Sequence, residues 1–263
     1  MENLKMTLIQ SDLDWEDPVL NRKRFRRVIS SLRANTDLIL LPEMFPTGFS
    51  NNPWKFAEVP GGPSEQFLRE MASRKQCAIA GSVLTRDHGR FYNRLIFCYP
   101  DGTVKKYDKR HLFRLSEEFR LFSAGNKRVV VSYKGWNILL QVCYDLRFPV
   151  WSKNTWKNNK YEYDLALYLA NWPDSRAHVW NTLLAARAME NQAYVAGVNR
   201  IGMDGNNTFH GGDSVLYTPK GTVLWKAPYG KASYHTVELN AMDLSLFRQS
   251  FTVGMDWDTF TLK

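Results

Sequence analysis

The chain has 263 residues, an apolar content of 44% and a formal net charge of +9, which suits one large α/β domain or two small ones. No apolar stretch approaches the roughly 18 residues that a membrane-spanning helix needs, so we expect no membrane association. Residues 1–5 lead straight into a strand-like segment and lack the apolar core of a signal peptide. We therefore expect a cytoplasmic protein.

Hydrophobic periodicity predicts alternating strands and helices in the first part of the chain. The predicted strands are 5–10, 37–41 and 77–84, and the predicted helices are 18–32 and 64–75, with Ser64 as the expected cap of the second helix. The densest basic cluster, 22–27, falls on the first helix. We interpret it as a solvated helix face rather than a weak polyanion patch, and we expect no nucleic-acid partner.

Two turns with strong turn residues predict hairpins farther along. Pro100-Asp101-Gly102 joins strands 91–99 and 103–107, and Pro219-Lys220-Gly221 joins strands 213–217 and 222–226. Between the hairpins we predict a long charged loop at 108–125, which is typical of a functional or a disordered segment. The other predicted strands are 128–132, 136–142, 164–169, 193–199 and 233–238, and the other predicted helices are 149–160, 175–191 and 241–249.

This order of elements indicates one α/β domain over residues 1–263, with mixed sheets covered by helices. The pattern alone is equally consistent with two layers and with a four-layer sandwich. A tail from about residue 250 to 263 is rich in Trp and Phe, which prefer to be covered. We interpret the tail as a candidate dimer-interface segment, and the alternative is that it packs on its own subunit.

Cysteine and histidine spacing matches no metal site. Three cysteines cannot all pair within one chain, and the five histidines are scattered. We therefore expect no metal and no cofactor. Cys77 and Cys98 lie in apolar, strand-like surroundings and are interpreted as buried thiols.

Cys143 stands at a corner that suits a nucleophile. It closes the apolar run 136–142, and the segment after it resembles the start of a helix. Free backbone N–H groups at such a corner favour a thiolate and can hold an oxyanion. Asp145 complements the helix dipole, and we expect Arg147 to pair with Asp145 or with Glu43. The alternative is an inert core cysteine.

Glu43 and Lys109 occupy similar positions at strand ends. Glu43 ends an apolar run, and burial makes a carboxylate a better proton acceptor by raising its pKa. Its alternative is a helix cap or a surface ion pair. Lys109 lies just past a predicted strand and can place an ammonium over a carbonyl oxygen, although most lysines are merely solvated. Together with Cys143 they suggest covalent hydrolysis of a carbon–nitrogen bond.

Three motifs carry a family resemblance. They are Leu41-Pro42-Glu43-Met44-Phe45, Asp108-Lys109-Arg110-His111-Leu112-Phe113 and Cys143-Tyr144-Asp145-Leu146-Arg147-Phe148-Pro149. In order and spacing they resemble the Glu, Lys and Cys motifs of the carbon–nitrogen hydrolase (nitrilase) superfamily, over residues 5 to 249. The resemblance implies a four-layer α-β-β-α sandwich with helices outside, and a homodimer or higher homo-oligomer.

The resemblance also implies catalytic roles. Cys143 would be the nucleophile, Glu43 the general base and Lys109 the stabiliser of the tetrahedral intermediate, with the backbone N–H of Tyr144 as a second oxyanion donor. Many members carry another glutamate in the loop after the lysine. Glu117 and Glu118 both lie there, and Glu118 matches the spacing better.

Departures from the nitrilase pattern indicate the branch. Nitrilases usually carry Cys-Trp-Glu at the nucleophile, whereas this chain has Cys143-Tyr144-Asp145. That string, with the segment 44–49 and with Asn171-Trp172-Pro173, is similar to the omega-amidases, which hydrolyse the terminal amide of 2-oxoglutaramate and 2-oxosuccinamate. The implied activity is hydrolysis of a small omega-amido acid through a cysteine thioester, with release of ammonia.

Other readings of the chain remain open at this point. An N-carbamoyl amino acid hydrolase or an aliphatic amidase of the same superfamily is the main alternative, and a non-catalytic binding module is another. From chain position, we predict that Arg176 receives the substrate carboxylate and that Phe45 and Trp172 wall the pocket. The expected partner is a small-molecule amide.

Overall fold

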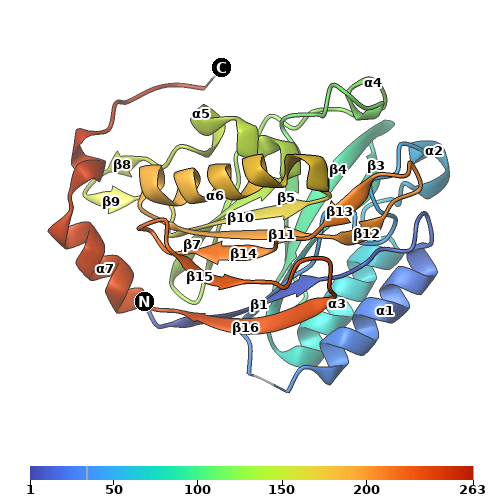
Figure 1. Ribbon diagram of the computed structural model, residues 1–263, viewed down its shortest axis with the longest axis horizontal. Coiled ribbons are helices and arrows are strands. Elements are labelled where there is room, and N and C mark those ends of the chain that lie inside the picture. The colour runs from blue at the N-terminus through green and yellow to red at the C-terminus, as the bar shows by residue number, and fades with distance from the viewer. Residues whose placement is uncertain (34, 263) are drawn as a thin grey trace.

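The computed structural model describes residues 1–33 and 35–262, in which two six-stranded mixed sheets stack face to face (Figure 1). The first sheet has the order β16 (Ser233–Leu239), β1 (Leu4–Gln10), β2 (Leu38–Leu40), β3 (Ala78–Asp87), β4 (Arg90–Cys98) and β5 (Val104–Asp108). The second has the order β15 (Val223–Lys226), β14 (Val215–Tyr217), β11 (Tyr194–Asn199), β10 (Leu165–Ala170), β7 (Trp136–Val142) and β6 (Val130–Tyr133).

Helices cover the outer faces of both sheets and complete the four layers. α1 (Pro18–Ser31) and α3 (Pro63–Lys75) pack on the first sheet, and α6 (Ala177–Asn191) packs on the second (Figure 1). The remaining helices are α2 (Pro53–Phe56), α4 (Glu118–Leu121), α5 (Pro149–Ser152) and α7 (Ala241–Ser250), with 3-10 helices at Cys143–Arg147, Asp174–Arg176 and Val253–Asp256. Two short hairpins, β8 (Trp156–Lys157) with β9 (Lys160–Tyr161) and β12 (Ile201–Met203) with β13 (Phe209–Gly211), lie outside the main sheets.

Side-chain alternation explains why the two sheets stack. In β2, Leu38 and Leu40 point into the core between the sheets, whereas Ile39 points to the core beneath α1 and α3. Successive side chains of a strand face opposite sides, so a continuous apolar run marks a strand that is buried on both faces. The predicted α-β-β-α sandwich is therefore confirmed, and the two-layer alternative is wrong.

Three local predictions are wrong. The helix predicted over 149–160 ends at Ser152, because the chain then forms the β8–β9 hairpin around Asn158 and Asn159, which both have positive φ. The predicted loop 108–125 contains α4. Ser64 is not the cap of α3, because the helix begins at Pro63 after Gly62. The Ser64 hydroxyl instead donates a hydrogen bond to Glu58.

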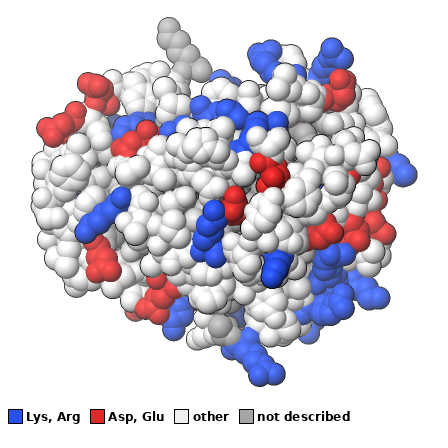
Figure 2. Space-filling model, viewed as in Figure 1, with Lys and Arg blue, Asp and Glu red and all other residues white. Residues whose placement is uncertain are grey.

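Three of the basic side chains of α1, those of Arg22, Arg24 and Arg26, form ion pairs with neighbouring acids. Arg22 pairs with Glu58 at 3.3 Å, and Arg26 pairs with Glu70 on α3. Figure 2 shows blue and red side chains together over this region of the surface. These contacts support the interpretation of residues 22–27 as a solvated helix face. Among the residues that the structure describes, no helix is both long and apolar enough to cross a membrane.

Candidate active site

The predicted catalytic residues meet where four strands end. Glu43 follows β2, Lys109 follows β5, Cys143 follows β7, and Asn171 follows β10. The first two strands belong to one sheet and the last two to the other. Residues separated by up to 128 positions in the chain are therefore brought into hydrogen-bonding contact at one edge of the sandwich.

Lys109 lies between two carboxylates. Its Nζ is 3.0 Å from Oε1 of Glu43 and 2.9 Å from Oε2 of Glu118, and all three side chains are fully buried. The Cys143 thiol lies close enough to Glu43 and Lys109 for their charges to act on its pKa. A carboxylate base near a thiol, beside a fixed cation, is the arrangement that activates a sulfur nucleophile and stabilises the oxyanion that its attack creates.

Burial determines the protonation of this cluster. It raises the pKa of the Cys143 thiol well above its ordinary value, and the negative charge of Glu43 adds to this effect. Burial alone would lower the pKa of Lys109, but the charges of Glu118 and Glu43 outweigh it and hold that pKa above its ordinary value. Burial also raises the pKa of Glu118, against the opposing influence of Lys109. The resting site therefore holds a thiol and an ammonium ion, and the thiol needs a base.

The adjacent acids Glu117 and Glu118 have different positions. Glu118 is buried, contacts Lys109 and accepts the backbone N–H of Phe113 at 2.7 Å. Glu117 is exposed and pairs with Arg120. The geometry thus favours Glu118 as the accessory acid, as the motif spacing predicted.

Two asparagines that the sequence analysis did not assign complete the surroundings of Glu43. Asn93 donates its side-chain N–H to Oε1 at 2.7 Å, and the backbone N–H of Asn171 donates to Oε2 at 2.7 Å. The sequence carried a signal for Asn93. It is the polar residue in the inward-facing series of β4 that continues through Leu95 and Phe97.

A strained turn places the nucleophile. Cys143 has a φ of 44°, a left-handed conformation that is rare outside glycine, and it opens the 3-10 helix Cys143–Arg147. Asp145 fixes this turn, because its carboxylate accepts the N–H of Val142 and the hydroxyl of Tyr107 and contacts Nδ1 of His111 at 2.8 Å. Asp145 thereby ties the nucleophile's turn to the segment that carries Lys109.

The pairing predicted for Arg147 is wrong. Within residues 1–33 and 35–262, Arg147 forms no ion pair with Asp145 or Glu43, since hydrogen bonds from other groups occupy both carboxylates. Its guanidinium instead lies 5.1 Å from the centre of the Trp172 ring, on the wall of the cavity.

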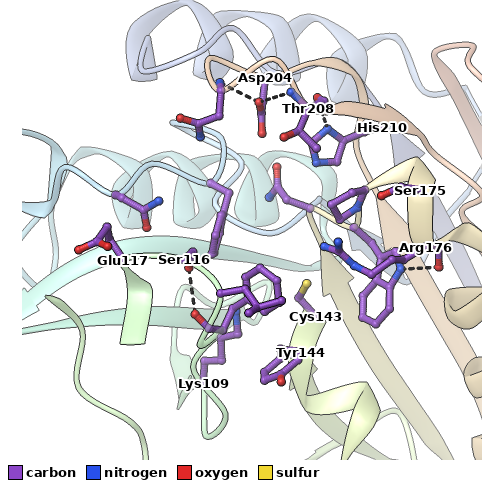
Figure 3. A pocket seen from close by; sticks show the side chains of 18 of the residues that line it. Lys109, Ser116, Glu117, Cys143, Tyr144, Ser175, Arg176, Asp204, Thr208 and His210 are labelled. Atoms are coloured by element: carbon purple, nitrogen blue, oxygen red, sulfur yellow. Dashed lines mark hydrogen bonds between the residues drawn. The ribbon is translucent and has the colours of Figure 1, made fainter. Parts of the chain in front are cut away.

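A cavity of about 550 Å³ opens above Cys143 (Figure 3). Tyr144, Trp172 and Arg176 line it, and the guanidinium of Arg176 lies 5.4 Å from the centre of the Phe113 ring. Asp204, Thr208 and His210 lie on the opposite rim, on the β12–β13 hairpin and its turn (Figure 3). Burial lowers the pKa of His210 to about 4, with a further contribution from Arg200, so this wall carries a neutral imidazole.

Phe45 does not lie on the cavity wall. Its ring is fully buried in the core beneath α1 and α3, 5.6 Å from that of Phe25 and 5.9 Å from that of Phe67. Phe49, four residues later, lines the cavity, and its ring centre is 5.2 Å from Nζ of Lys109. The motif spans both phenylalanines, and pattern alone does not show which of them turns inward.

Comparisons with known proteins agree with this geometry. A family model described as carbon-nitrogen hydrolase matches residues 6–249. The chain is 45% identical to the omega-amidase YafV of Yersinia enterocolitica over 100% of both chains. It is 33% identical to the 2-oxoglutaramate amidase of Bacillus subtilis, over 83% of this chain and 84% of that protein.

A solved structure is also very similar. XC1258 from Xanthomonas campestris, described as a CN-hydrolase superfamily protein, superimposes with a TM-score of 0.98 at 40% identity and with 100% of both chains covered. The resemblance inferred from the three motifs is therefore confirmed. The chain belongs to the carbon–nitrogen hydrolase family.

Proposed function

We propose that this protein is an omega-amidase, which hydrolyses the terminal amide of a small omega-amido acid such as 2-oxoglutaramate. The observation that carries the proposal is a buried Glu43–Lys109 pair beside Cys143, at the base of a cavity whose wall holds the guanidinium groups of Arg147 and Arg176. The cluster supplies amide hydrolysis, and the arginines supply recognition of a carboxylate at the far end of the substrate. The names of the relatives from Yersinia enterocolitica and Bacillus subtilis support the same assignment.

The first half of the reaction forms a thioester. Glu43 takes the thiol proton as the sulfur of Cys143 attacks the amide carbon, and negative charge collects on the carbonyl oxygen. The ammonium of Lys109 and the backbone N–H of Tyr144 stabilise that charge, and losing one such donor typically costs about 3 kcal/mol of barrier. The protonated Glu43 then gives its proton to the nitrogen, the carbon–nitrogen bond breaks, and ammonia leaves.

In the second half of the reaction, the same groups act on a water molecule. Glu43 accepts a proton from a water molecule, and the resulting hydroxide attacks the thioester carbon. The same donors hold the second oxyanion. The carbon–sulfur bond then breaks, Glu43 returns the proton to the sulfur, and the product leaves as a carboxylic acid. Glu118 stays in contact with Lys109 and holds its ammonium in place.

Both arginines are suited to a carboxylate. Among the described residues neither forms an ion pair, and each guanidinium lies over an aromatic ring, that of Arg147 5.1 Å from the centre of Trp172 and that of Arg176 5.4 Å from the centre of Phe113. A guanidinium without a carboxylate partner in the chain keeps its N–H groups available for two parallel hydrogen bonds to a substrate carboxylate. Chain position alone predicts only Arg176 for this role, and we propose that Arg147 shares it because Arg147 lies four residues from Cys143.

Release of ammonia from 2-oxoglutaramate tests the proposal. We expect turnover by the wild type and none by Cys143→Ala, because no other thiol in the described chain lies at the cavity. Cys77→Ala serves as the matched control, since Cys77 is buried in the core beneath α1 and α3. A folded wild type that does not hydrolyse 2-oxoglutaramate but cleaves N-carbamoyl amino acids or aliphatic amides would contradict the omega-amidase assignment. That result would still be consistent with the carbon–nitrogen hydrolase family.

We further propose that residues 1–263 act as one catalytic domain and that the carboxyl-terminal tail covers a second copy of the chain. Trp257 packs on Tyr161 of its own subunit, 5.6 Å between ring centres, whereas Phe251, Met255 and Phe260 are exposed. Exposed apolar groups of this size favour an interface. Sedimentation of the full chain and of a variant that ends at residue 250 tests this, with a dimer expected only for the full chain.

A further inference from the structure

Asn93 is a buried polar residue on an otherwise apolar face of its strand. It lies on β4, on the face that carries Leu95 and Phe97 into the core between the sheets, and it is 0% exposed. Its backbone carbonyl accepts the N–H of Lys109 at 2.9 Å, so it also adjoins the strand end that carries the catalytic lysine.

The side-chain amide of Asn93 reaches both carboxylates of the catalytic cluster. Its Nδ2 is 2.7 Å from Oε1 of Glu43 and 3.2 Å from Oε1 of Glu118. Carboxylate oxygens only accept hydrogen bonds, so the nitrogen must face them and the orientation of the amide is determined. As a result the Asn93 Oδ1 is buried without a partner among the described residues.

An orphaned acceptor of this kind is unfavourable, and an apolar side chain of similar size would remove it. The hydrogen bonds that the Asn93 amide donates to two acidic side chains offset the cost of its unpaired oxygen. Glu43 and Glu118 are two buried carboxylates that share one ammonium, that of Lys109. A neutral amide adds donors to the anions without adding another charge, and its shorter bond is to the base.

We propose that Asn93 is a positioning residue that keeps Glu43 ionised and oriented toward Cys143. The inference rests on the proposed function in assigning Glu43 as the base. Asn93 donates to Glu43 at 2.7 Å and to Glu118 at 3.2 Å, so it holds the base more closely than the accessory acid. The charged and titratable groups that face Glu43 are Lys109 from the loop after β5, Glu118 from α4 and Cys143 from the turn after β7.

The test is the pH dependence of Cys143 alkylation by iodoacetamide, followed by mass spectrometry. This reaction needs no amide substrate, so its outcome is independent of whether the omega-amidase assignment holds. In the wild type we expect the rate to fall in acid, where the thiol no longer has a base; this falling part of the profile is its acid limb. Asn93→Leu removes a hydrogen-bond donor that holds the carboxylate of the base, so we expect the acid limb to move upward by about one pH unit.

Two further variants separate positioning from simple structural support. Asn93→Asp replaces the donor by a third acid, and we expect the acid limb of the alkylation profile to move to a higher pH than in Asn93→Leu. Ser82→Ala is the matched control, because the Ser82 hydroxyl is also buried and holds the backbone N–H of Met44 at 2.7 Å but does not touch the Glu43 carboxylate. We expect it to lower the melting temperature without moving the acid limb.

The same acid limb should appear in kcat/KM for any amide that the enzyme cleaves, with KM nearly unchanged in Asn93→Leu. If Asn93→Leu does not fold, Asn93→Ala carries the same expectation without added bulk. A folded Asn93 variant whose alkylation keeps the wild-type acid limb would overturn the proposal. A displaced limb in a protein that cleaves no omega-amide would uphold the role of Asn93 and reject the substrate assignment.

Discussion

Glu117 and Glu118 are neighbours in sequence, yet one is solvated and the other fully buried against Lys109. The difference arises from α4, which begins at Glu118 and turns this side chain inward. Spacing to the family motif favoured Glu118, but the doubled acid left the choice open in the sequence. The contact of Glu118 with Lys109 supports Glu118, and that contact depends on the folded loop.

Exchanging each acid for its amide tests this difference. Glu118→Gln removes a charge that holds Lys109, and we expect kcat to fall by about 10² or more, the size of effect that follows loss of a stabilising group in an oxyanion site. Glu117→Gln alters an exposed pair, so its kcat should stay within about twofold of the wild type. Steady-state kinetics at neutral pH measures both, and equal losses would contradict the assignment.

Recognition of the substrate carboxylate can be tested one arginine at a time. Arg147→Ala removes a charged hydrogen-bond donor, which is typically worth about 1.5–3 kcal/mol, so we expect KM for 2-oxoglutaramate to rise about tenfold to a hundredfold. A neutral amide of similar length, which has no carboxylate to bind, provides the comparison. If KM rises equally for both amides, Arg147 shapes the pocket and does not read the carboxylate.

Short elements were harder to predict than long ones. The helices 18–32 and 175–191 follow from their apolar periodicity, and most main-sheet strands follow from their apolar runs. The β8–β9 hairpin was missed because its strands have two residues each and its turn is Asn158-Asn159 rather than a turn containing glycine. So short a segment carries no measurable period.

The turn of this hairpin has a testable conformational requirement. Asn159 is exposed and has a φ of 58°, so a residue with a larger left-handed penalty should destabilise the element. We expect Asn159→Ala to lower the free energy of unfolding by about 1 kcal/mol and Asn159→Gly to be neutral or slightly stabilising. Urea unfolding of the three proteins measures this, and equal midpoints would contradict the conformational argument.

At the scale of the whole molecule, the positions of the proposed catalytic residues were predictable from motifs, but their contacts were not. Glu43, Lys109 and Cys143 each stand beside a strand end that the sequence shows. Asn93 and Asn171 donate hydrogen bonds to Glu43 from 50 and 128 positions away in the chain, and no local pattern encodes these contacts. The same limit explains Phe45 and Phe49, since the path of the chain after β2 decides which ring reaches the cavity.

The buried thiols link global stability to pH. Burial raises the pKa of Cys77 from 9.0 to about 12, so between these values the folded chain keeps a proton that the unfolded chain loses. A raised pKa stabilises the folded state below the unfolded value, and this contribution is lost as pH rises. We therefore expect the destabilisation by Cys77→Ala to be about 1.4 kcal/mol smaller at pH 10 than at pH 7.

Denaturant titration at the two pH values measures this difference. No other cysteine variant is needed as a control. The unfolded wild type and the unfolded Cys77→Ala protein titrate in the same way at every residue except residue 77. A destabilisation that is identical at the two pH values would show that the Cys77 thiol is not shielded from solvent as the structure has it.

Because the cluster is divided between the two sheets, catalytic activity depends on the distance between the sheets. Glu43 and Lys109 move with one sheet and Cys143 with the other, and the side chains of the central core set their separation. A loosening too small to break any strand ladder still draws sulfur away from its base. During gradual denaturation, turnover should therefore vanish while the circular dichroism of the sheets is intact.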